Sequence, residues 1–257
     1  MPRLAANVSM LFTEHAFLDR LAAAAQAGFA GVEFLFPYAW QAADIKARLD
    51  DAGVELVLFN MSPGDWDNGE RGLAALPGRE GQFARALDEA LGYAQALGCR
   101  RLHAMAGLTT AGANRETYLA NLEIAARAAA SAGIDILIEP INTFDMPGYF
   151  LTRTAEAAAI IRDVGASNLR LQLDLYHRHR MEGDVAGALR DYAPLVAHYQ
   201  IAGPPDRGEP IPSELDVPAL FGAIDDTGYA GWIGCEYRPR NGTLAGLSWR
   251  QVAAREV

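Results

Sequence analysis

Cysteine is scarce in this chain of 257 residues: only Cys99 and Cys235 occur, and both lie inside apolar segments. Two thiols of this kind fit a reduced intracellular protein better than a disulfide-stabilised secreted one. No apolar run approaches the ~18 residues of a membrane span, and no apolar leader precedes the first expected strand. We therefore expect a cytoplasmic protein without a membrane partner.

Basic charge and histidine are also in short supply. The chain has 22 Lys and Arg residues against 32 Asp and Glu residues, which gives a net charge of −10. No basic stripe is visible that would bind a phosphate backbone, so a nucleic acid is not expected as a partner. The five histidines are too few to suggest the several-metal cluster of a nuclease. A small anionic substrate remains compatible, because it needs only one or two local cations.

What the chain does contain is a repeated unit of strand, loop and helix, often followed by glycine and the next strand. Apolar residues make up 51% of the sequence, which is enough for one large core. Strands are expected at 4–9, 31–36, 55–60, 101–105, 134–139, 169–174, 197–201 and 232–237. Helices are expected at 17–27, 42–52, 82–97, 115–132, 154–164, 185–192, 218–227 and 247–257.

Eight such units in a chain of this length are typical of a (β/α)₈ barrel, whose active site lies at the carboxyl ends of the strands. The main alternative, a doubly wound open sheet, usually carries a glycine-rich turn after its first strand. The corresponding segment Ser9–Glu14 has no glycine. We therefore predict a single TIM-barrel domain that spans residues 1–257.

Oxygen-bearing side chains close four consecutive expected strands: Glu139, Asp174, Gln200 and Glu236. One such acid would more simply be a solvated strand end, but parallel strands bring all four to one rim of the barrel. Hard divalent cations such as Mg²⁺ and Mn²⁺ prefer oxygen ligands, whereas zinc and copper favour nitrogen and sulfur. The strand ends therefore predict a divalent-metal site.

The chain resembles the hydroxypyruvate isomerase family, which belongs to the xylose isomerase-like sugar isomerases and epimerases. The likeness runs over nearly the whole chain and is carried by Asn7–Glu14, Gly64–Trp66, Gly69–Gly72, Glu139–Asn142, Pro147–Tyr149, Gln172–His177, Met181–Asp184, Gln200–Ala202, Gly228–Tyr229 and Gly231–Tyr237. The resemblance implies that the metal ligands are Glu139, Asp174, Gln200 and Glu236. It also implies that Glu139 and Glu236 are the paired proton donor and acceptor.

Four further residues are candidates for binding the substrate. His177 follows the sixth strand, and the resemblance implies a substrate or metal contact there; the alternative is a surface histidine. Arg207 either clamps a substrate carboxylate with two parallel hydrogen bonds or forms a loop salt bridge. His103 either polarises the substrate or is a satisfied core histidine. Glu209 is expected beside the substrate or at the rim of the site.

The segment 61–79 is a long polar loop that contains Trp66 and Arg71. We expect a surface loop here; the alternative is a loop that closes over the site and excludes water.

The resemblance implies an isomerase that converts hydroxypyruvate to 2-hydroxy-3-oxopropanoate (tartronate semialdehyde) through an enediolate, with Mg²⁺ or Mn²⁺ as the cofactor. Three alternatives stay open: a ketose 3-epimerase, an isomerase of a longer 2-oxo sugar acid, and a non-catalytic sugar-acid-binding module. The family also implies a homo-oligomer, as a dimer or a tetramer.

Overall fold

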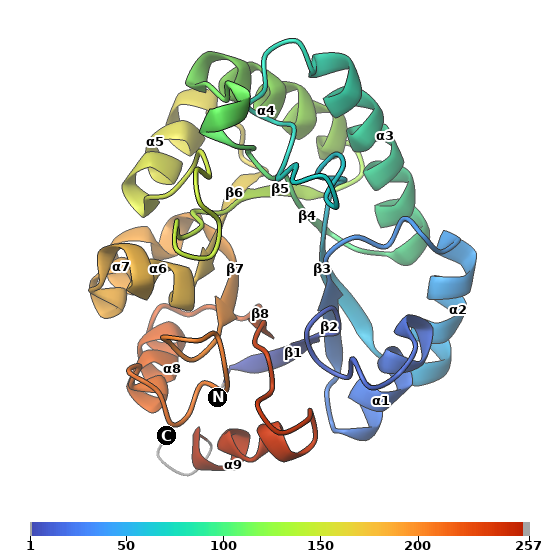
Figure 1. Cartoon of the computed structure of the whole chain (residues 1–257), viewed down its shortest axis with the longest axis vertical. Helices are drawn as coiled ribbons and strands as arrows, with labels where there is room; N and C mark the ends of the chain where they lie inside the picture. The colour runs from blue at the N-terminus through green and yellow to red at the C-terminus, as the bar shows by residue number, and fades with distance from the viewer. Residues whose placement is uncertain (1, 254–257) are drawn as a thin grey trace.

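The computed structural model describes residues 2–253. Eight parallel strands close into a barrel in chain order, and β8 pairs with β1 to complete it (Figure 1). The strands are β1 Arg3–Asn7, β2 Gly31–Phe34, β3 Glu55–Asn60, β4 Arg101–His103, β5 Asp135–Ile138, β6 Leu169–Asp174, β7 Val196–Ile201 and β8 Trp232–Cys235. The predicted (β/α)₈ barrel is confirmed.

Helices surround the barrel as an outer ring (Figure 1). They are α1 Arg20–Gln26, α2 Ala42–Ala52, α3 Glu80–Leu97, α4 Arg115–Ala130, α5 Thr154–Val164, α6 Leu175–Glu182, α7 Val185–Tyr192, α8 Val217–Asp226 and α9 Trp249–Ala253. Short 3₁₀ turns cover Phe17–Asp19, Thr109–Ala111, Ala193–Leu195 and Ala245–Leu247. The expected last helix runs over 247–257, of which 254–257 lie outside the described residues.

Helix α6 was not predicted. Among the differences between the predicted and the observed helices, it is the one that affects the candidate site. It begins immediately after β6, where the Asp174 side chain accepts a hydrogen bond from the backbone N–H of Tyr176 and caps the helix. Helix α2 ends as expected, before Gly53, which adopts a left-handed φ of 66°. Within residues 2–253, no helix combines the length and the apolar character needed to cross a membrane.

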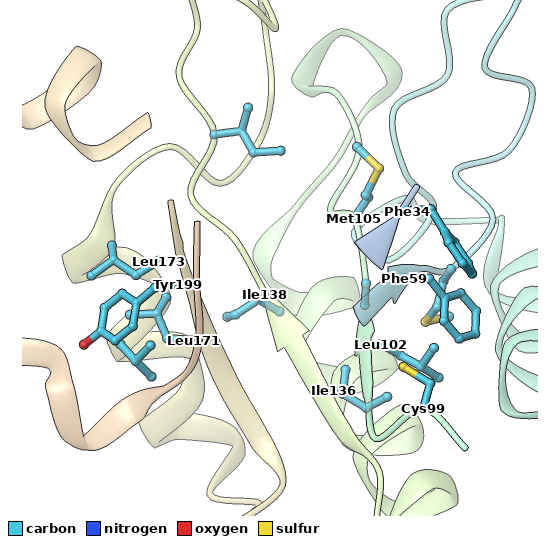
Figure 2. Packing of buried hydrophobic residues seen from close by; sticks show 14 of the residues in the cluster. Phe34, Phe59, Cys99, Leu102, Met105, Ile136, Ile138, Leu171, Leu173 and Tyr199 are labelled. Carbon is cyan, nitrogen blue, oxygen red and sulfur yellow. The ribbon is translucent and has the colours of Figure 1, made fainter. Parts of the chain in front are cut away.

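The main core lies between the strands and the helices. Successive residues of a strand point to opposite faces, so Ile136 and Ile138 of β5 pack outwards against the helices, whereas Leu137 belongs to a separate, small buried cluster. Figure 2 shows part of the outer layer, in which Ile138 lies between two groups of side chains, one with Leu171, Leu173 and Tyr199 and the other with Phe34, Phe59 and Leu102. Cys99 and Cys235 are both buried and free, as expected.

The barrel interior towards the carboxyl ends of the strands is polar instead. Asn7, Glu33, His103, Gln172, Asp174, His198, Gln200 and Glu236 are all at least nine-tenths buried. Polar groups are buried at this density only where they are paired or serve a ligand. The fold therefore puts its functional candidates at one end of the barrel.

Candidate active site

A cavity of about 680 Å³ opens at the carboxyl ends of the strands. Its walls include Asn60, Trp66, Arg71, His103, Glu139, Asp145, His177, Arg207, Glu236 and Arg238. A second cavity of about 700 Å³ opens at the opposite end of the barrel, around Trp232 and Arg250. The described residues that line this second cavity include no carboxylate and no histidine. The chemistry therefore belongs to the first cavity.

Three candidate residues lie close together at this end of the barrel, and two of them, Glu139 and His177, line the cavity. Glu139 directly follows β5, Asp174 ends β6, and His177 lies in the first turn of α6. Because the capping position and the residue three further on share one face of the helix start, Asp174 and His177 point to the same place. One ligand atom from each of the three residues lies within 4.8 Å of the others.

Arg207 links Asp174 of this cluster to a fourth candidate residue, Glu236. Its Nη2 atom lies 3.4 Å from Asp174 Oδ2 and 3.2 Å from Glu236 Oε1. The arginine has a left-handed φ of 59°, and its carbonyl oxygen accepts a hydrogen bond from the backbone N–H of Arg238. Such a backbone conformation is uncommon outside glycine and costs energy, so the surrounding loop must hold it in place. Arg207 thus forms salt bridges, and its partners are two candidate metal ligands. The expected clamp on a substrate carboxylate stays a prediction.

Burial changes the protonation of these acids. Burial raises the pKa of Glu139 well above its usual range, and the carboxylates of Glu236 and Asp174 raise it further. Burial likewise raises the pKa of Glu236 to about 8 and the pKa of Asp174 to about 6, although the positive charge of Arg207 opposes both shifts. A divalent cation bound here would oppose these shifts, because its positive charge would stabilise the ionised carboxylates.

The donor set fits a hard cation. Glu139 Oε1 is buried and has no hydrogen-bond partner among the residues that the structure describes. Such an unpaired carboxylate oxygen is costly unless a cation or a ligand meets it. Asp174 Oδ2 has only Arg207 Nη2 within hydrogen-bond range in the described part of the chain. Glu139 Oε1 and Asp174 Oδ2 both lie near His177 Nε2, so they are close to one another. Glu139 and Asp174 are therefore the best-supported residues to hold a metal.

Gln200 is held by a network that the sequence did not predict. Its Oε1 accepts a hydrogen bond of 2.6 Å from Gln172 Nε2, which also donates to Glu139 Oε2 over 3.0 Å. Its Nε2 donates to Glu33 Oε1 over 2.8 Å. The other Glu33 oxygen lies 2.6 Å from His198 Nε2. Gln172 therefore links the carbonyl oxygen of Gln200 to the carboxylate of Glu139.

His177 is better placed to donate a hydrogen bond than to bind a metal. Asn142 Oδ1 accepts from the backbone N–H of Asp145, so Asn142 Nδ2 faces His177 Nδ1, 2.6 Å away. A neutral imidazole that accepts at Nδ1 carries its proton on Nε2. Burial lowers the pKa of His177 well below its usual range, so the ring is neutral. Its Nε2–H points towards Glu139 Oε1 and Asp174 Oδ2, which lie 3.7 and 3.6 Å away.

His103 faces the cavity, 3.5 Å from Glu139 Oε2, and burial lowers its pKa to about 3. Neither ring nitrogen has a hydrogen-bond partner among the described residues, so it is not a satisfied core histidine. Glu209 is not brought to the cavity wall. It accepts hydrogen bonds from the Arg240 backbone N–H over 2.9 Å and from Arg240 Nη1 over 2.7 Å. The structure thus pairs Glu209 with Arg240, and its expected place beside the substrate or at the rim of the site stays a prediction.

Trp66 and Arg71 both line the cavity, so the expectation of a plain surface loop was wrong. The residues that sequence reasoning missed are Glu33, Gln172 and Asn142. A signal existed for Glu33, because a single acid inside an otherwise apolar strand has to find partners when that strand is buried on both sides.

Comparison with known proteins agrees with this geometry. The family described as xylose isomerase-like TIM barrel matches residues 21–253. The 2-oxo-tetronate isomerase of Cupriavidus necator is 57% identical over 253 residues, with 97% of each chain covered. The hydroxypyruvate isomerase of Escherichia coli is 45% identical, with 97% of this chain and 98% of that protein covered.

A crystal structure from Brucella melitensis, described as an AP endonuclease of family 2, has a TM-score of 0.96 and 48% sequence identity. The match covers 98% of this chain and 99% of that chain. Full-length likeness at these identities reaches well beyond a shared fold. The chain therefore belongs to the hydroxypyruvate isomerase family of the xylose isomerase-like TIM barrels.

Proposed function

We propose that this protein is a divalent-cation-dependent isomerase of short 2-oxo acids that carry a hydroxyl group on C3. The observation that carries the proposal is that Glu139, Glu236 and Arg207 line one cavity, where Arg207 pairs with both Glu236 and Asp174. The favoured substrate is 2-oxo-tetronate, because the relative of that name is 57% identical. Hydroxypyruvate is the second candidate, because the relative of that name is 45% identical and has the same arrangement at C2 and C3.

The residues that would hold the cation are Glu139, Asp174, Gln200 and Glu236. When bound, Mg²⁺ or Mn²⁺ would supply a Lewis acid that stabilises negative charge on the two neighbouring oxygens of the substrate. The His177 Nε2–H group would donate a hydrogen bond to one of those oxygens, since its tautomer is fixed by Asn142. Both contributions favour the enediolate over the starting ketone.

The reaction moves hydrogen between two adjacent carbons and needs no external oxidant or reductant. One glutamate removes the proton from C3, which gives the enediolate, and a proton is returned at C2 while the hydroxyl proton passes from O3 to O2. The product is the 2-hydroxy-3-oxo acid. Glu139 and Glu236 suit these steps because both carboxyl groups are buried and both line the cavity that would hold the substrate.

The experiment is turnover of 2-oxo-tetronate and hydroxypyruvate by metal-stripped protein with and without added Mg²⁺ or Mn²⁺, followed by NMR in D₂O. The proposal requires cation-dependent formation of the 2-hydroxy-3-oxo acid with solvent deuterium at C2. Deuterium exchange at C3 of a neutral ketose, with no acid converted, would instead indicate a ketose 3-epimerase. Binding of the acids without any exchange would indicate a binding module.

The endonuclease description of the Brucella structure suggests one further assay. A net charge of −10 is unfavourable for a protein that must bind a phosphate backbone. We expect no cleavage of a duplex with an abasic site under the conditions that support isomerisation. Cleavage that is lost in Glu139→Gln would assign the site to nucleic acid instead.

A further inference from the structure

Among the described residues, the candidate cation site offers no free cationic side chain to an acidic substrate. It brings the acids Glu139, Asp174 and Glu236 together with one arginine, Arg207. Arg207 is also already paired with Asp174 and Glu236. A substrate carboxylate in this cavity therefore needs a separate cationic partner.

Arg71 has the free hydrogen-bonding edge that such a partner needs. Its Nη1 atom donates to the carbonyl oxygens of Trp66 and Glu70 over 2.9 and 2.7 Å, which uses both of its hydrogens. No hydrogen bond is formed by Nε or Nη2 within the described residues, and no carboxylate among them pairs with Arg71. Nε–H and the facing Nη2–H form the side edge of a guanidinium, which binds a carboxylate through two parallel hydrogen bonds.

The guanidinium is also held rigidly in position. Its plane lies over the indole of Trp66, with Cζ 3.9 Å from the ring centroid. The neighbouring acid, Glu70, is occupied by Arg79, whose Nη1 lies 2.7 Å from Glu70 Oε1. Arg71 is therefore left without a neutralising partner from its own loop.

The backbone after Arg71 is pinned to the end of β4. Gly72 forms an isolated bridge with Ala106 and has a φ of 124°, and a Cβ added there would lie 2.3 Å from the carbonyl oxygen of Met105. Only glycine allows this approach, which places the preceding side chain in the wall of the cavity that His103 also lines. The loop segment that carries Arg71 is therefore a fixed part of the cavity wall.

We propose that Arg71 binds the carboxylate of the substrate acid side-on, through Nε and Nη2, and so selects 2-oxo acids over neutral ketoses. This inference rests on the proposed isomerase function and adds the residue that defines its substrate class. Arg238 is the other cavity arginine without an acid partner among the described residues, but its side chain is exposed and lacks a stacking partner there. Arg71 is the better organised of the two.

The test compares acids with neutral ketoses that differ only in the replacement of the carboxylate by a hydroxymethyl group. 2-Oxo-tetronate is paired with erythrulose, and hydroxypyruvate with dihydroxyacetone. The Mn²⁺-loaded wild type is measured beside Arg71→Gln, Arg71→Lys, Arg238→Gln and Arg48→Gln. Arg48 lies exposed on α2, so its variant removes the same charge away from the cavity. Calorimetry with 2-oxobutanoate, which lacks the C3 hydroxyl, measures acid binding without turnover.

Arg71→Gln should raise the KM for 2-oxo-tetronate and the Kd for 2-oxobutanoate about 10- to 100-fold, the range of a charge-assisted pair. The kcat/KM for erythrulose should fall by a much smaller factor, because its hydroxymethyl group carries no charge for Arg71 to pair with. Arg71→Lys should give a smaller increase, because lysine keeps the charge and loses the side-on geometry. It serves as the test variant if Arg71→Gln does not fold.

Unchanged 2-oxobutanoate binding in both Arg71 variants would overturn the inference. So would equal losses for the acid and the ketose, or an acid-specific loss in Arg238→Gln alone. If the wild type converts neither acid, the proposed function fails, and the calorimetric comparison still decides the role of Arg71.

Discussion

Gln200 Nε2 donates a hydrogen bond of 2.8 Å to Glu33 Oε1 inside the barrel, which fixes the direction of the Gln200 amide. The Glu33 carboxylate occupies space that β8 leaves open at Gly234, where an added Cβ would lie 2.3 Å from Glu33 Oε2. Through this contact, β2 controls the orientation of a candidate metal ligand on β7. Partners that orient a ligand commonly affect metal affinity as strongly as some ligands do.

Glu33→Met should lower the Mn²⁺ affinity about tenfold, because it removes the acceptor that orients Gln200 while keeping a similar side-chain volume. Glu33→Gln keeps one acceptor and should lose less. Titration calorimetry measures both, with Glu55→Gln as an exposed control for the lost charge. Wild-type affinity in Glu33→Met, with only a lower Tm, would reduce Glu33 to a structural role.

Gly234→Ala should destabilise the protein by about 1–3 kcal/mol, since the new methyl group overlaps the Glu33 carboxylate. For a protein of this size, each kcal/mol lowers the Tm by roughly 2–4 °C. Calorimetric unfolding measures the change. Gly222→Ala is the control, because nothing lies within 4 Å of a Cβ added there. Equal Tm values for the two variants would show that Glu33 can move without cost.

Cation affinity should rise with pH between about pH 6 and 8. Burial raises the pKa of Asp174 from 3.8 to about 6 and that of Glu236 from 4.5 to about 8 in the metal-free protein. The contribution of these two groups to the stability of the metal-free protein is therefore fully present below their unfolded pKa values and is lost as the pH rises through their folded pKa values. A bound cation must displace these protons.

Calorimetric titration of Mn²⁺ at pH 6.5, in two buffers of different ionisation enthalpy, should therefore detect proton release. The part of the release that comes from Asp174 and Glu236 should vanish at pH 9, where both of these carboxyl groups are already ionised. Pre-paired acids with ordinary pKa values would instead give a pH-independent affinity over this interval.

Arg207→Met should destabilise the metal-free protein by about 3 kcal/mol, because it leaves buried carboxylates without their counter-charge. The loss should be larger at pH 9 than at pH 6, since Asp174 and Glu236 can remain protonated at the lower pH. Urea unfolding at the two pH values measures it. Added Mn²⁺ should restore more stability to this variant than to the wild type, and an equal gain in both proteins would contradict the pairing.

The strand ends could be predicted from the sequence because their signal is local. An apolar run that stops at an acid needs only the period of a strand and the convergence of parallel strands to place Glu139 and Asp174 together. Helix α6 could not be predicted in the same way. Its sequence Leu175–Glu182 is short and strongly polar, and it lacks the apolar repeat of an amphipathic helix. Its start depends on the Asp174 cap.

Glu33 and Arg71 escaped prediction because their roles depend on contacts between distant segments. Glu33 needs the open space at Gly234 on a strand with which its own strand does not pair. Arg71 reaches the cavity only because Gly72 bridges to Ala106 after β4. Neither contact produces a periodic pattern of apolar residues from which it could be predicted.

The most direct measurement of the central claim is turnover of 2-oxo-tetronate by metal-stripped wild type, Glu139→Gln and Glu236→Gln, each with and without added Mn²⁺. The isomerase account predicts no turnover without the cation, and restored turnover in the wild type only. Each substitution should reduce kcat by about 10²- to 10⁴-fold, the range of general acid–base catalysis. Turnover that survives chelation, or that either variant retains at the wild-type rate, would contradict it.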